Sequence, residues 1–516
     1  MTAPPRKLGI ITLGCRLNQH ESDSLTGKFL QQGFSLEENP GKSDSPVQVC
    51  IVNTCAVTAR GEQKSRQALA RIRKQHPEAI IIVTGCAVEN NQEQFQKDDK
   101  IFFVDNDRKH AIAEIAERAL AAAQPGESSP ERAPGHTPEL APNRFAFAPA
   151  ASVLHTRASL KVEDGCDNEC AYCIVPRVRG KAQSRPIGDC LEAARALLAK
   201  GYHEIVITGV NIQQYRDPAS AEGLDMLMRA LLNLEGDFRL RLSSIEPECE
   251  HENISWTQNT IHRAPPLAQP AWLPPRKVSG DDGPPPPDME TPRQNAGDAL
   301  TRLFDHERLC PHLHLCVQSG SDRVLARMRR RYRAEDIVRL CAGLRQTENP
   351  HTASRGGIPG AAKFPARRLF NLTADIIVGF PGESDADFAD TLDIVRECGF
   401  THAHAFPFSP RPGSPAAEFS DRLSKDTVSK RMQALRRLVQ ENRNTFLHSL
   451  IGIQEKVLIE KIHADGSASG YGRLYVPVRI PASPDHPMRV NTFVDCEAAG
   501  LEPERNGLIA RPCAKT

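Results

Sequence analysis

Short apolar runs alternate with helical patterns over the first 120 residues of the chain. The four clearest runs occupy residues 8–14, 47–53, 79–85 and 101–105. Apolar runs of this length, with helical segments such as residues 65–75 between them, are typical of strands buried on both faces of a parallel sheet. We therefore expect residues 1–120 to form an N-terminal domain built on an open parallel α/β sheet.

The same alternation resumes at residue 151 and continues to residue 450. Strand-like runs cover residues 158–164, 204–210, 238–247, 312–320, 373–383 and 402–413. Helical segments such as residues 190–202 lie between them. Repeated strand–helix units predict a full or partial (β/α) barrel, and the chemistry of such barrels lies at the C-terminal ends of the strands.

Three stretches show neither strand-like apolar runs nor a helical pattern. Residues 121–150 are rich in Pro, Gly and Ser and are predicted to be a linker. Residues 251–298 and 348–370 interrupt the barrel pattern. We expect them to be disordered insertions, because they offer too little regular apolar surface to offset the entropy of ordering. A misread gene boundary is the alternative explanation for both insertions.

The last part of the chain, residues 451–516, contains short runs in which apolar and polar positions alternate, such as 455–462, 470–480 and 492–498. Alternation over short lengths predicts a small antiparallel β-barrel. The chain as a whole is therefore expected to be an α/β protein that ends in a β-barrel.

Composition adds limits to this picture. The chain has 516 residues, of which 25% are charged and 40% hydrophobic, as in globular proteins of several domains. Its apolar runs are far shorter than the roughly 20 residues that span a bilayer, and the N-terminus lacks the apolar core of a signal peptide. We expect a cytoplasmic protein that does not bind membranes. The net charge of +1 provides no overall attraction for nucleic acid, so local patches would have to supply it.

Fifteen cysteines are scattered along the chain. An odd number without an export signal argues against a disulfide framework and favours reduced thiols or metal ligands. Three of them, Cys166, Cys170 and Cys173, form a C-x3-C-x2-C stretch. Structural zinc sites use four ligands, usually in two separated pairs, and fit this spacing poorly. An iron–sulfur cluster is usually held by four thiolates, so three would leave one iron open for chemistry. Buried thiols or a zinc knuckle remain the alternatives.

A second group of cysteines is spread over the N-terminal domain. Cys15, Cys55 and Cys86 each follow a predicted parallel strand. The C-terminal ends of such strands share one edge of the sheet, where ligands bind. Any one of these cysteines alone would more often be a core residue. Three of them in the same structural position predict a second three-thiolate cluster.

The C-x3-C-x2-C stretch within a barrel-like pattern resembles the radical S-adenosylmethionine enzymes, as does Tyr172 before the last cysteine. The resemblance implies that the open iron binds S-adenosylmethionine and that an electron from the cluster cleaves it to a 5′-deoxyadenosyl radical. It also implies that the ends of later strands contact the cosubstrate, and the residues expected there are Gly209, Asn211, Glu246 and Gln318.

Two such clusters followed by a β-barrel resemble the methylthiotransferases. In that family the first cluster carries or relays sulfur, one S-adenosylmethionine supplies a methyl group, and another supplies the radical. The C-terminal barrel resembles a TRAM domain, which binds RNA. The resemblance implies two 4Fe-4S clusters and S-adenosyl-L-methionine as cofactors. It also implies the anticodon loop of tRNA as substrate, a flavodoxin-type electron donor and a monomeric enzyme.

The stretches 12–22 and 53–67 resemble the branch of the family that modifies C2 of N6-threonylcarbamoyladenosine in tRNA. Other branches act on isopentenyladenosine in tRNA or on an aspartate of a ribosomal protein, and both remain alternatives. A non-catalytic iron–sulfur protein that binds RNA or senses redox state is an alternative of another class.

Basic residues gather in residues 176–185 and 327–333, beside the cysteine loop and after a predicted strand. Such runs supply phosphate contacts in RNA-binding proteins, although a solvated face is the common alternative. The residues expected to contact RNA are Arg177, Arg179, Lys181, Arg329, Arg330 and Arg331. In the last domain, Tyr471 and Tyr475 are candidates for base stacking.

Overall fold

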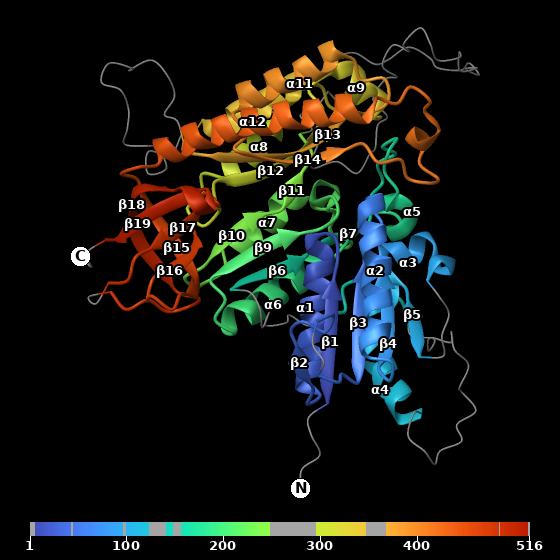
Figure 1. Cartoon of the computed structure of the whole chain (residues 1–516). Helices are drawn as coiled ribbons and strands as arrows, with labels where there is room; N and C mark the ends of the chain where they lie inside the picture. The colour runs from blue at the N-terminus through green and yellow to red at the C-terminus, as the bar shows by residue number, and fades with distance from the viewer. Residues whose placement is uncertain are drawn as a thin grey trace, which may run out of the picture.

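A computed structural model describes residues 6–42, 45–95, 100–122, 141–147, 156–247, 296–346, 368–483 and 486–513. Figure 1 shows a central domain of strands and helices that contacts an N-terminal α/β domain on one side and a C-terminal barrel on the other. The predicted fold class, α/β with a terminal β-barrel, is confirmed.

The N-terminal domain is a five-stranded parallel sheet in the order β2-β1-β3-β4-β5. Its strands are β1 (Lys7–Thr12), β2 (Ser35–Glu37), β3 (Val49–Thr54), β4 (Ile80–Gly85) and β5 (Ile101–Val104). Every residue of β3 and β4 is buried, because helices cover both faces of the sheet. One face packs against α1 (Arg16–Gln31) and α4 (Ile112–Ala122), and the other against α2 (Ala59–Gln75) and the short α3 (Cys86–Asn90).

The stretch predicted as a linker, residues 121–150, lies mostly outside the described residues. Its first two residues belong to α4, and residues 141–147 return along the N-terminal domain. Phe147 is buried in the core beside α1 and α4, and Arg144 donates hydrogen bonds to Asp107 and to the backbone oxygen of Arg179. This part of the stretch is therefore packed against the two domains that it connects.

The central domain is a partial (β/α) barrel. Its parallel strands are β6 (Arg157–Lys161), β9 (Glu204–Thr208), β10 (Arg239–Leu242), β11 (Ser244–Ile245), β12 (His312–Gln318), β13 (Asn371–Val378) and β14 (His402–Pro407). They form two sheets, β10-β9-β6 and β11-β12-β13-β14, which meet where Leu240 bridges Leu309. One continuous core joins both sheets, while β6 and β14 remain edges, so the barrel is open on one side.

Helices cover the outer surface of this barrel. They are α6 (Ile187–Ala199), α7 (Leu224–Leu232), α8 (Ala296–Leu303), α9 (Asp322–Arg327), α10 (Ala334–Arg345), α11 (Asp385–Cys398) and α12 (Lys425–Ser449). The long α12 lies along β14 and leads to the C-terminal barrel (Figure 1). Between β6 and α6 the chain forms a loop with the small strands β7 (Glu163–Asp164) and β8 (Gln183–Ser184) and the short α5 (Val175–Arg179).

The predicted insertions, residues 251–298 and 348–370, fall almost entirely outside the described residues. The chain resumes at α8 after the first and at Arg368 after the second, and Phe370 is already part of the barrel core. Within the described ranges, no helix has the length and the apolar character that crossing a membrane requires.

The C-terminal barrel is closed, in the order β15-β16-β17-β19-β18. Its strands are β15 (Gln454–Ile462), β16 (Ala468–Tyr471), β17 (Pro477–Ile480), β18 (Phe493–Glu502) and β19 (Gly507–Pro512). The predicted antiparallel pairing holds for every neighbouring pair except β17 and β19, which run parallel and close the barrel.

Arginines of the central domain hold this barrel in place. Arg239 donates to the backbone oxygens of Lys456 and Tyr471, and Arg241 donates to those of Gly472 and Arg473. Both guanidinium groups are buried and paired with the fully buried Glu204, at 2.6 Å and 2.8 Å. The C-terminal barrel is therefore attached through hydrogen bonds that its main-chain oxygens accept.

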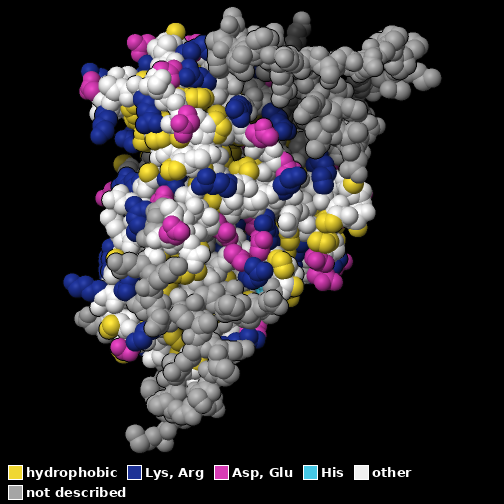
Figure 2. Space-filling model, turned by 90° about the vertical axis from the view of Figure 1, so that its right-hand side faces the viewer, with side chains coloured by type: hydrophobic (Ala, Val, Ile, Leu, Met, Phe, Trp, Pro, Cys, Tyr) yellow, Lys and Arg dark blue, Asp and Glu magenta, His cyan; other side chains and the backbone are white. Residues whose placement is uncertain are grey.

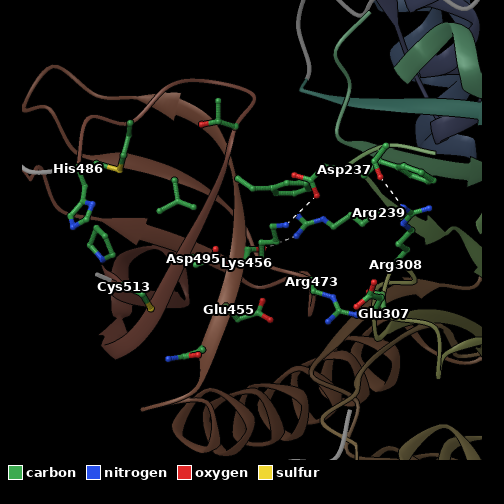
Figure 3. Close-up of a pocket in the computed structure, with 18 of the residues that line it drawn as sticks. Asp237, Arg239, Glu307, Arg308, Glu455, Lys456, Arg473, His486, Asp495 and Cys513 are labelled. Atoms are coloured by element: carbon green, nitrogen blue, oxygen red, sulfur yellow. Dashed lines mark hydrogen bonds and ion pairs between the residues drawn. The ribbon is translucent and has the colours of Figure 1, made fainter. Parts of the chain in front are cut away.

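A cleft of about 1270 Å³ separates the two domains next to these contacts. Figure 3 shows that Asp237, Arg239 and Arg308 line it from the central domain, while Lys456 projects from the barrel toward Asp237, 3.2 Å away. None of the six predicted cluster cysteines lines this cleft, so the predicted chemistry lies elsewhere.

Candidate active site: two cysteine triads

Three cysteines meet at the C-terminal edge of the N-terminal sheet, as the strand pattern predicted. Cys15 follows β1 and caps α1, Cys55 follows β3, and Cys86 follows β4 as the first residue of α3. Cys15 and Cys86 lie close to Cys55. A negative charge on either thiol raises the pKa of Cys55 beyond the rise that burial alone causes. Cys15 is exposed, while Cys55 and Cys86 are buried.

Glycines allow the chain to turn sharply into this site. Gly14 has φ of 100°, and a Cβ atom there would lie 2.9 Å from the sulfur of Cys55. Gly85 has φ of 97°, and a Cβ atom there would lie 2.4 Å from the backbone oxygen of Thr54. Any larger residue would be strained and would collide with the strand end that presents Cys55.

The second triad is built by a single loop. Cys166, Cys170 and Cys173 lie between β7 and α5, and the backbone N–H of Cys173 donates to the oxygen of Cys170 at 3.1 Å. The three thiols interact electrostatically with one another. Arg330, which lies between α9 and α10, donates from Nη1 to the sulfur of Cys170 at 3.1 Å.

Glu246 supports this loop from the end of β11. Its carboxylate accepts hydrogen bonds from Arg330 at 3.1 Å and from Asn168 at 3.0 Å. Tyr332 and Arg330 also bond to the backbone oxygen of Cys316 on β12. Glu246 thus helps to position the cysteine loop, and its predicted contact with S-adenosylmethionine stays a prediction.

The thiols of both triads need a metal to become ligands. Burial raises the pKa of Cys55 to about 11 and the pKa of Cys166 and Cys173 each to about 12. Thiols with these pKa values are neutral near pH 7, and a coordinated cation is what deprotonates them.

Each site offers three thiols, one fewer than the ligands of a structural zinc site. No three His, Cys, Asp or Glu side chains among the described residues converge closely enough to hold one metal ion. In a four-iron cluster the thiolates bind different irons and need not converge on one point. Three thiols per site, with cationic groups beside them, therefore form a donor set that suits an iron–sulfur cluster.

A buried network of charges lies behind the first triad. Burial raises the pKa of the Cys86 thiol, and Arg179 lies near enough for its positive charge to oppose that rise. Arg179 also pairs with Asp164 at 2.9 Å and with Glu21 at 3.2 Å. Lys161 pairs with Asp164 at 2.6 Å and with Glu21 at 3.0 Å, and Lys109 also pairs with Glu21. All five side chains are almost completely buried. Three cations face two anions, so an anionic cluster on Cys86 would supply the missing negative charge.

Buried polar atoms without hydrogen-bond partners lie at strand ends beside the second triad. The backbone N–H of Asn211 donates to Glu163 Oε2 at 2.7 Å, and a Cβ atom on Gly209 would lie 2.7 Å from the same oxygen. Glu163 Oε1, Asn211 Oδ1 and Ser243 Oγ are buried without a hydrogen-bond partner. Unpaired buried polar atoms at neighbouring strand ends are the mark of a ligand site.

Two of these groups, Glu163 and Ser243, were not predicted. Glu163 directly precedes the cysteine loop, and its position after a strand was the available signal. Burial raises its pKa to about 8, so near pH 7 it is largely protonated. Gln318, a predicted cosubstrate contact, ends β12 with φ of 62°, a backbone conformation that is rare for residues other than glycine.

The predicted RNA contacts divide into two groups. Arg177, Lys181, Arg329 and Arg331 are exposed. Arg179 and Arg330 are buried and point at cluster cysteines, so the interpretation of these two as phosphate contacts is corrected. Figure 2 shows one face of the molecule, with basic side chains spread among acidic and hydrophobic ones.

The two tyrosines expected to stack on bases are occupied by protein. Tyr471 and Tyr475 stack on each other, with centroids 5.0 Å apart, and Arg157 lies over both rings. Arg16 and Arg241 also lie over Tyr475. These rings therefore join the C-terminal barrel to the other two domains.

Comparison with known families agrees with this architecture. Residues 160–255 match the profile described as the Radical SAM superfamily, and residues 7–104 match the profile described as Uncharacterized protein family UPF0004. The first match contains the cysteine loop, and the second contains Cys15, Cys55 and Cys86. The fold and the loop thus define a radical S-adenosylmethionine enzyme, a class that uses a [4Fe–4S] cluster and S-adenosylmethionine.

Related proteins narrow the class. The chain is 31% identical to a protein of Thermotoga maritima named threonylcarbamoyladenosine tRNA methylthiotransferase MtaB, over 90% of this chain and 89% of that one. A protein of Treponema pallidum with the same name is 29% identical over 88% and 90%. A tRNA-2-methylthio-N(6)-dimethylallyladenosine synthase of Pelotomaculum thermopropionicum is 30% identical over 91% and 90%. This chain belongs to the methylthiotransferase family of radical S-adenosylmethionine enzymes.

Proposed function

We propose that this enzyme adds a methylthio group to C2 of N6-threonylcarbamoyladenosine next to the anticodon of tRNA. It uses S-adenosylmethionine as methyl donor and radical source. Two [4Fe–4S] clusters, one on each triad, a flavodoxin-type electron donor, a monomeric state and a cytoplasmic location complete the proposal. The names of the Thermotoga and Treponema relatives support this substrate.

The observation that carries the proposal is the connection between the triads. α5, which follows the second triad, packs against α3, which begins with Cys86 of the first. Arg179 at the end of α5 lies near Cys86 and pairs with Asp164, the neighbour of Glu163. Two sites joined by one short helix suit a reaction that needs both a sulfur source and a radical.

The residues of the chain have separate tasks in this scheme. When bound, the clusters and S-adenosylmethionine supply the electron, the radical, the methyl group and the sulfur. Cys15, Cys55 and Cys86 hold the first cluster, and the loop cysteines hold the second. Glu163, Asn211 and Ser243 offer free polar atoms to the cosubstrate, with Gly209 leaving room and Gln318 at the neighbouring strand end. Glu246 and Arg330 fix the loop and keep a positive charge beside Cys170.

The test is a nucleoside analysis of tRNA from cells with and without this gene, by mass spectrometry. We expect the 2-methylthio derivative of threonylcarbamoyladenosine to disappear without the gene and to return with the wild-type copy. A Cys170→Ala copy, expressed to the same level, is the matched control and should not restore it. Loss of the methylthio derivative of isopentenyladenosine instead would assign the substrate of the Pelotomaculum relative. Unchanged tRNA would favour a ribosomal-protein substrate.

A further inference from the structure

Three neighbouring rings are exposed on an edge strand of the central barrel. On the edge strand β14, Ala403 and Ala405 pack against the core, whereas His402, His404 and Phe406 are exposed on the opposite face. Alternate residues of a strand point to opposite sides, so these three rings share one face. Phe406 is 41% exposed, which is unusual for a side chain of its size.

The three rings form a row. The centroids of His402 and His404 lie 4.6 Å apart, and Phe406 is stacked with His404 at 6.3 Å and an interplanar angle of 29°. His314 of β12 lies 5.3 Å from His404. His314 is itself fixed, because Nε2 lies 3.0 Å from Asp375 Oδ1 and Nδ1 lies 2.8 Å from Thr373 Oγ1. The row therefore rests on a rigid base.

This face lies on an edge strand of the open barrel, and residues that neighbour each triad lie close to it. β12, which carries His314, also carries Cys316, whose backbone oxygen accepts from Arg330 beside Cys170. On the other side, Arg16 directly follows Cys15 and is near enough to contribute, after burial and His314, to lowering the pKa of His404. The loop after β14 reaches the N-terminal domain, where Ser409 accepts from the backbone N–H of Ala59 at 3.3 Å.

Charged groups of both signs surround this face, because Asp375 is paired with His314 while two arginines lie near the other histidines. Arg16 lies near His404, and Arg443 lies near His402. Arg16 is exposed and its guanidinium donates to Tyr475 Oη at 3.0 Å, which holds it at this side of the barrel. Exposed rings flanked by arginines suit a single-stranded nucleic acid, because every base has a face that stacks and every nucleotide carries a negative phosphate.

We propose that His402, His404 and Phe406 form a stacking surface for an unpaired base of the RNA substrate, beside the base that is modified. This inference rests on the proposed function, since it assigns a contact to the same substrate. The three residues bind the RNA and take no part in the reaction, which occurs at the two triads.

The test uses the intact, cluster-loaded enzyme and a fluorescently labelled RNA anticodon stem-loop that contains threonylcarbamoyladenosine. Phe406→Ala and His404→Ala should each weaken binding about tenfold by fluorescence anisotropy, as expected for the loss of one stacked ring. Phe406→Tyr, which keeps the ring, should bind like wild type. Met226→Ala removes an equally exposed side chain, 40% against 41%, from the distant outer helix α7 and should have no effect.

Two further measurements separate the possible outcomes. Iron content and 5′-deoxyadenosine formation without RNA should be unchanged in both alanine variants, which shows that the clusters are intact. If wild type and both alanine variants bind the RNA equally well, the stacking surface is refuted while the proposed function stands. If wild type binds no RNA but binds a ribosomal-protein peptide, the proposed function and this inference both fall.

Discussion

The two cysteine triads have the same number of ligands but are assembled in opposite ways. Cys166, Cys170 and Cys173 belong to one loop, so their spacing is a local property of the chain. Cys15, Cys55 and Cys86 follow three different strands, and only the folded sheet brings them together. The comparison teaches that a ligand set can be encoded by a sequence motif or by the register of a sheet, with the same chemical result.

Their electrostatic surroundings differ as well. Beside the second triad, one buried cation, Arg330, faces one carboxylate, Glu246. Behind the first triad, three buried cations face two carboxylates. The first site therefore has an excess positive charge that the proposed cluster would neutralise, while the charges beside the second triad are balanced.

Removing one triad at a time is expected to have the largest effect. The triple variant Cys166→Ala/Cys170→Ala/Cys173→Ala should lose all 5′-deoxyadenosine formation. The variant Cys15→Ala/Cys55→Ala/Cys86→Ala should retain it but produce no methylthiolated RNA. Each should lower the iron content from about eight to about four per chain, as measured after anaerobic reconstitution. Full iron content in the second variant would contradict the assignment of the first triad.

Replacing each buried arginine should affect its own cluster alone. A cation beside a cluster sulfur stabilises the reduced, more negative state, so Arg179→Ala should lower the reduction potential of the first cluster. We expect a change on the order of 60 mV, which corresponds to about 1.4 kcal/mol for one electron. Redox titration by electron paramagnetic resonance, in proteins that hold only one cluster, measures it.

Arg330→Ala should act in the same way on the second cluster, with Arg179→Lys and Arg330→Lys as controls that keep the charge. Equal shifts at both clusters from either variant would show that the two sites do not have separate electrostatic environments.

The carboxylate beside each triad should respond to pH in opposite directions. Burial raises the pKa of Glu163 to about 8, so between its ordinary pKa of 4.5 and 8 only the folded protein holds the proton. The free energy of unfolding should then fall by up to about 1.4 kcal/mol per pH unit as the pH rises through this window. Glu163→Gln should remove that slope in thermal melts, and an unchanged slope would show that Glu163 is ionised in the folded protein.

Glu21 is the contrasting case behind the first triad. Burial alone would raise its pKa, but Lys109, Arg179 and Lys161 lower it well below the ordinary value. Its contribution to stability is therefore present above pH 4.5 and is lost only in acid, as the pH falls through the lowered pKa. Glu21→Gln should destabilise the protein at neutral pH, where Glu163→Gln should stabilise it.

The smallest effect is expected from the exposed basic residues near the second triad. Lys181→Ala and Arg331→Ala should each weaken RNA binding slightly and lower the slope of log affinity against log salt concentration by about one if the side chain contacts a phosphate. Lys425→Ala on α12, another exposed cation, is the control. A slope equal to that of wild type would place the RNA elsewhere.

Much of the fold was predictable because each domain has a distinct hydrophobic period. The continuous apolar runs of the N-terminal sheet and the alternating runs 455–462 and 492–498 of the last domain each matched an observed strand. Residues 470–480 were predicted as one run, but the chain turns between Tyr471 and Pro477 to make two strands. The parallel pair β17–β19 was missed, because pairing between distant strands leaves no local pattern.

The candidate site was predictable only as far as its cysteines. The strand pattern of the sequence predicted that Cys15, Cys55 and Cys86 lie at one edge of the sheet. The structure places these three cysteines together at that edge. The charge pattern gave a wrong prediction of RNA contacts for Arg179 and Arg330, because a run of basic residues does not show which of its side chains is buried. The partners that bury them, Glu21, Asp164 and Glu246, lie far away in the chain or on the other side of the loop.

The attachment of the C-terminal barrel has a consequence for how substrates are chosen. Arg239 and Arg241 donate to main-chain oxygens of Lys456, Tyr471 and Arg473, and the side chains of these three residues add their own contacts to the central domain. The barrel is thus firmly attached to the central domain, and these contacts set its separation from both triads. Any nucleic acid held by it must have the right length and bend to deliver an adenosine to the chemistry, so geometry itself selects among candidate molecules.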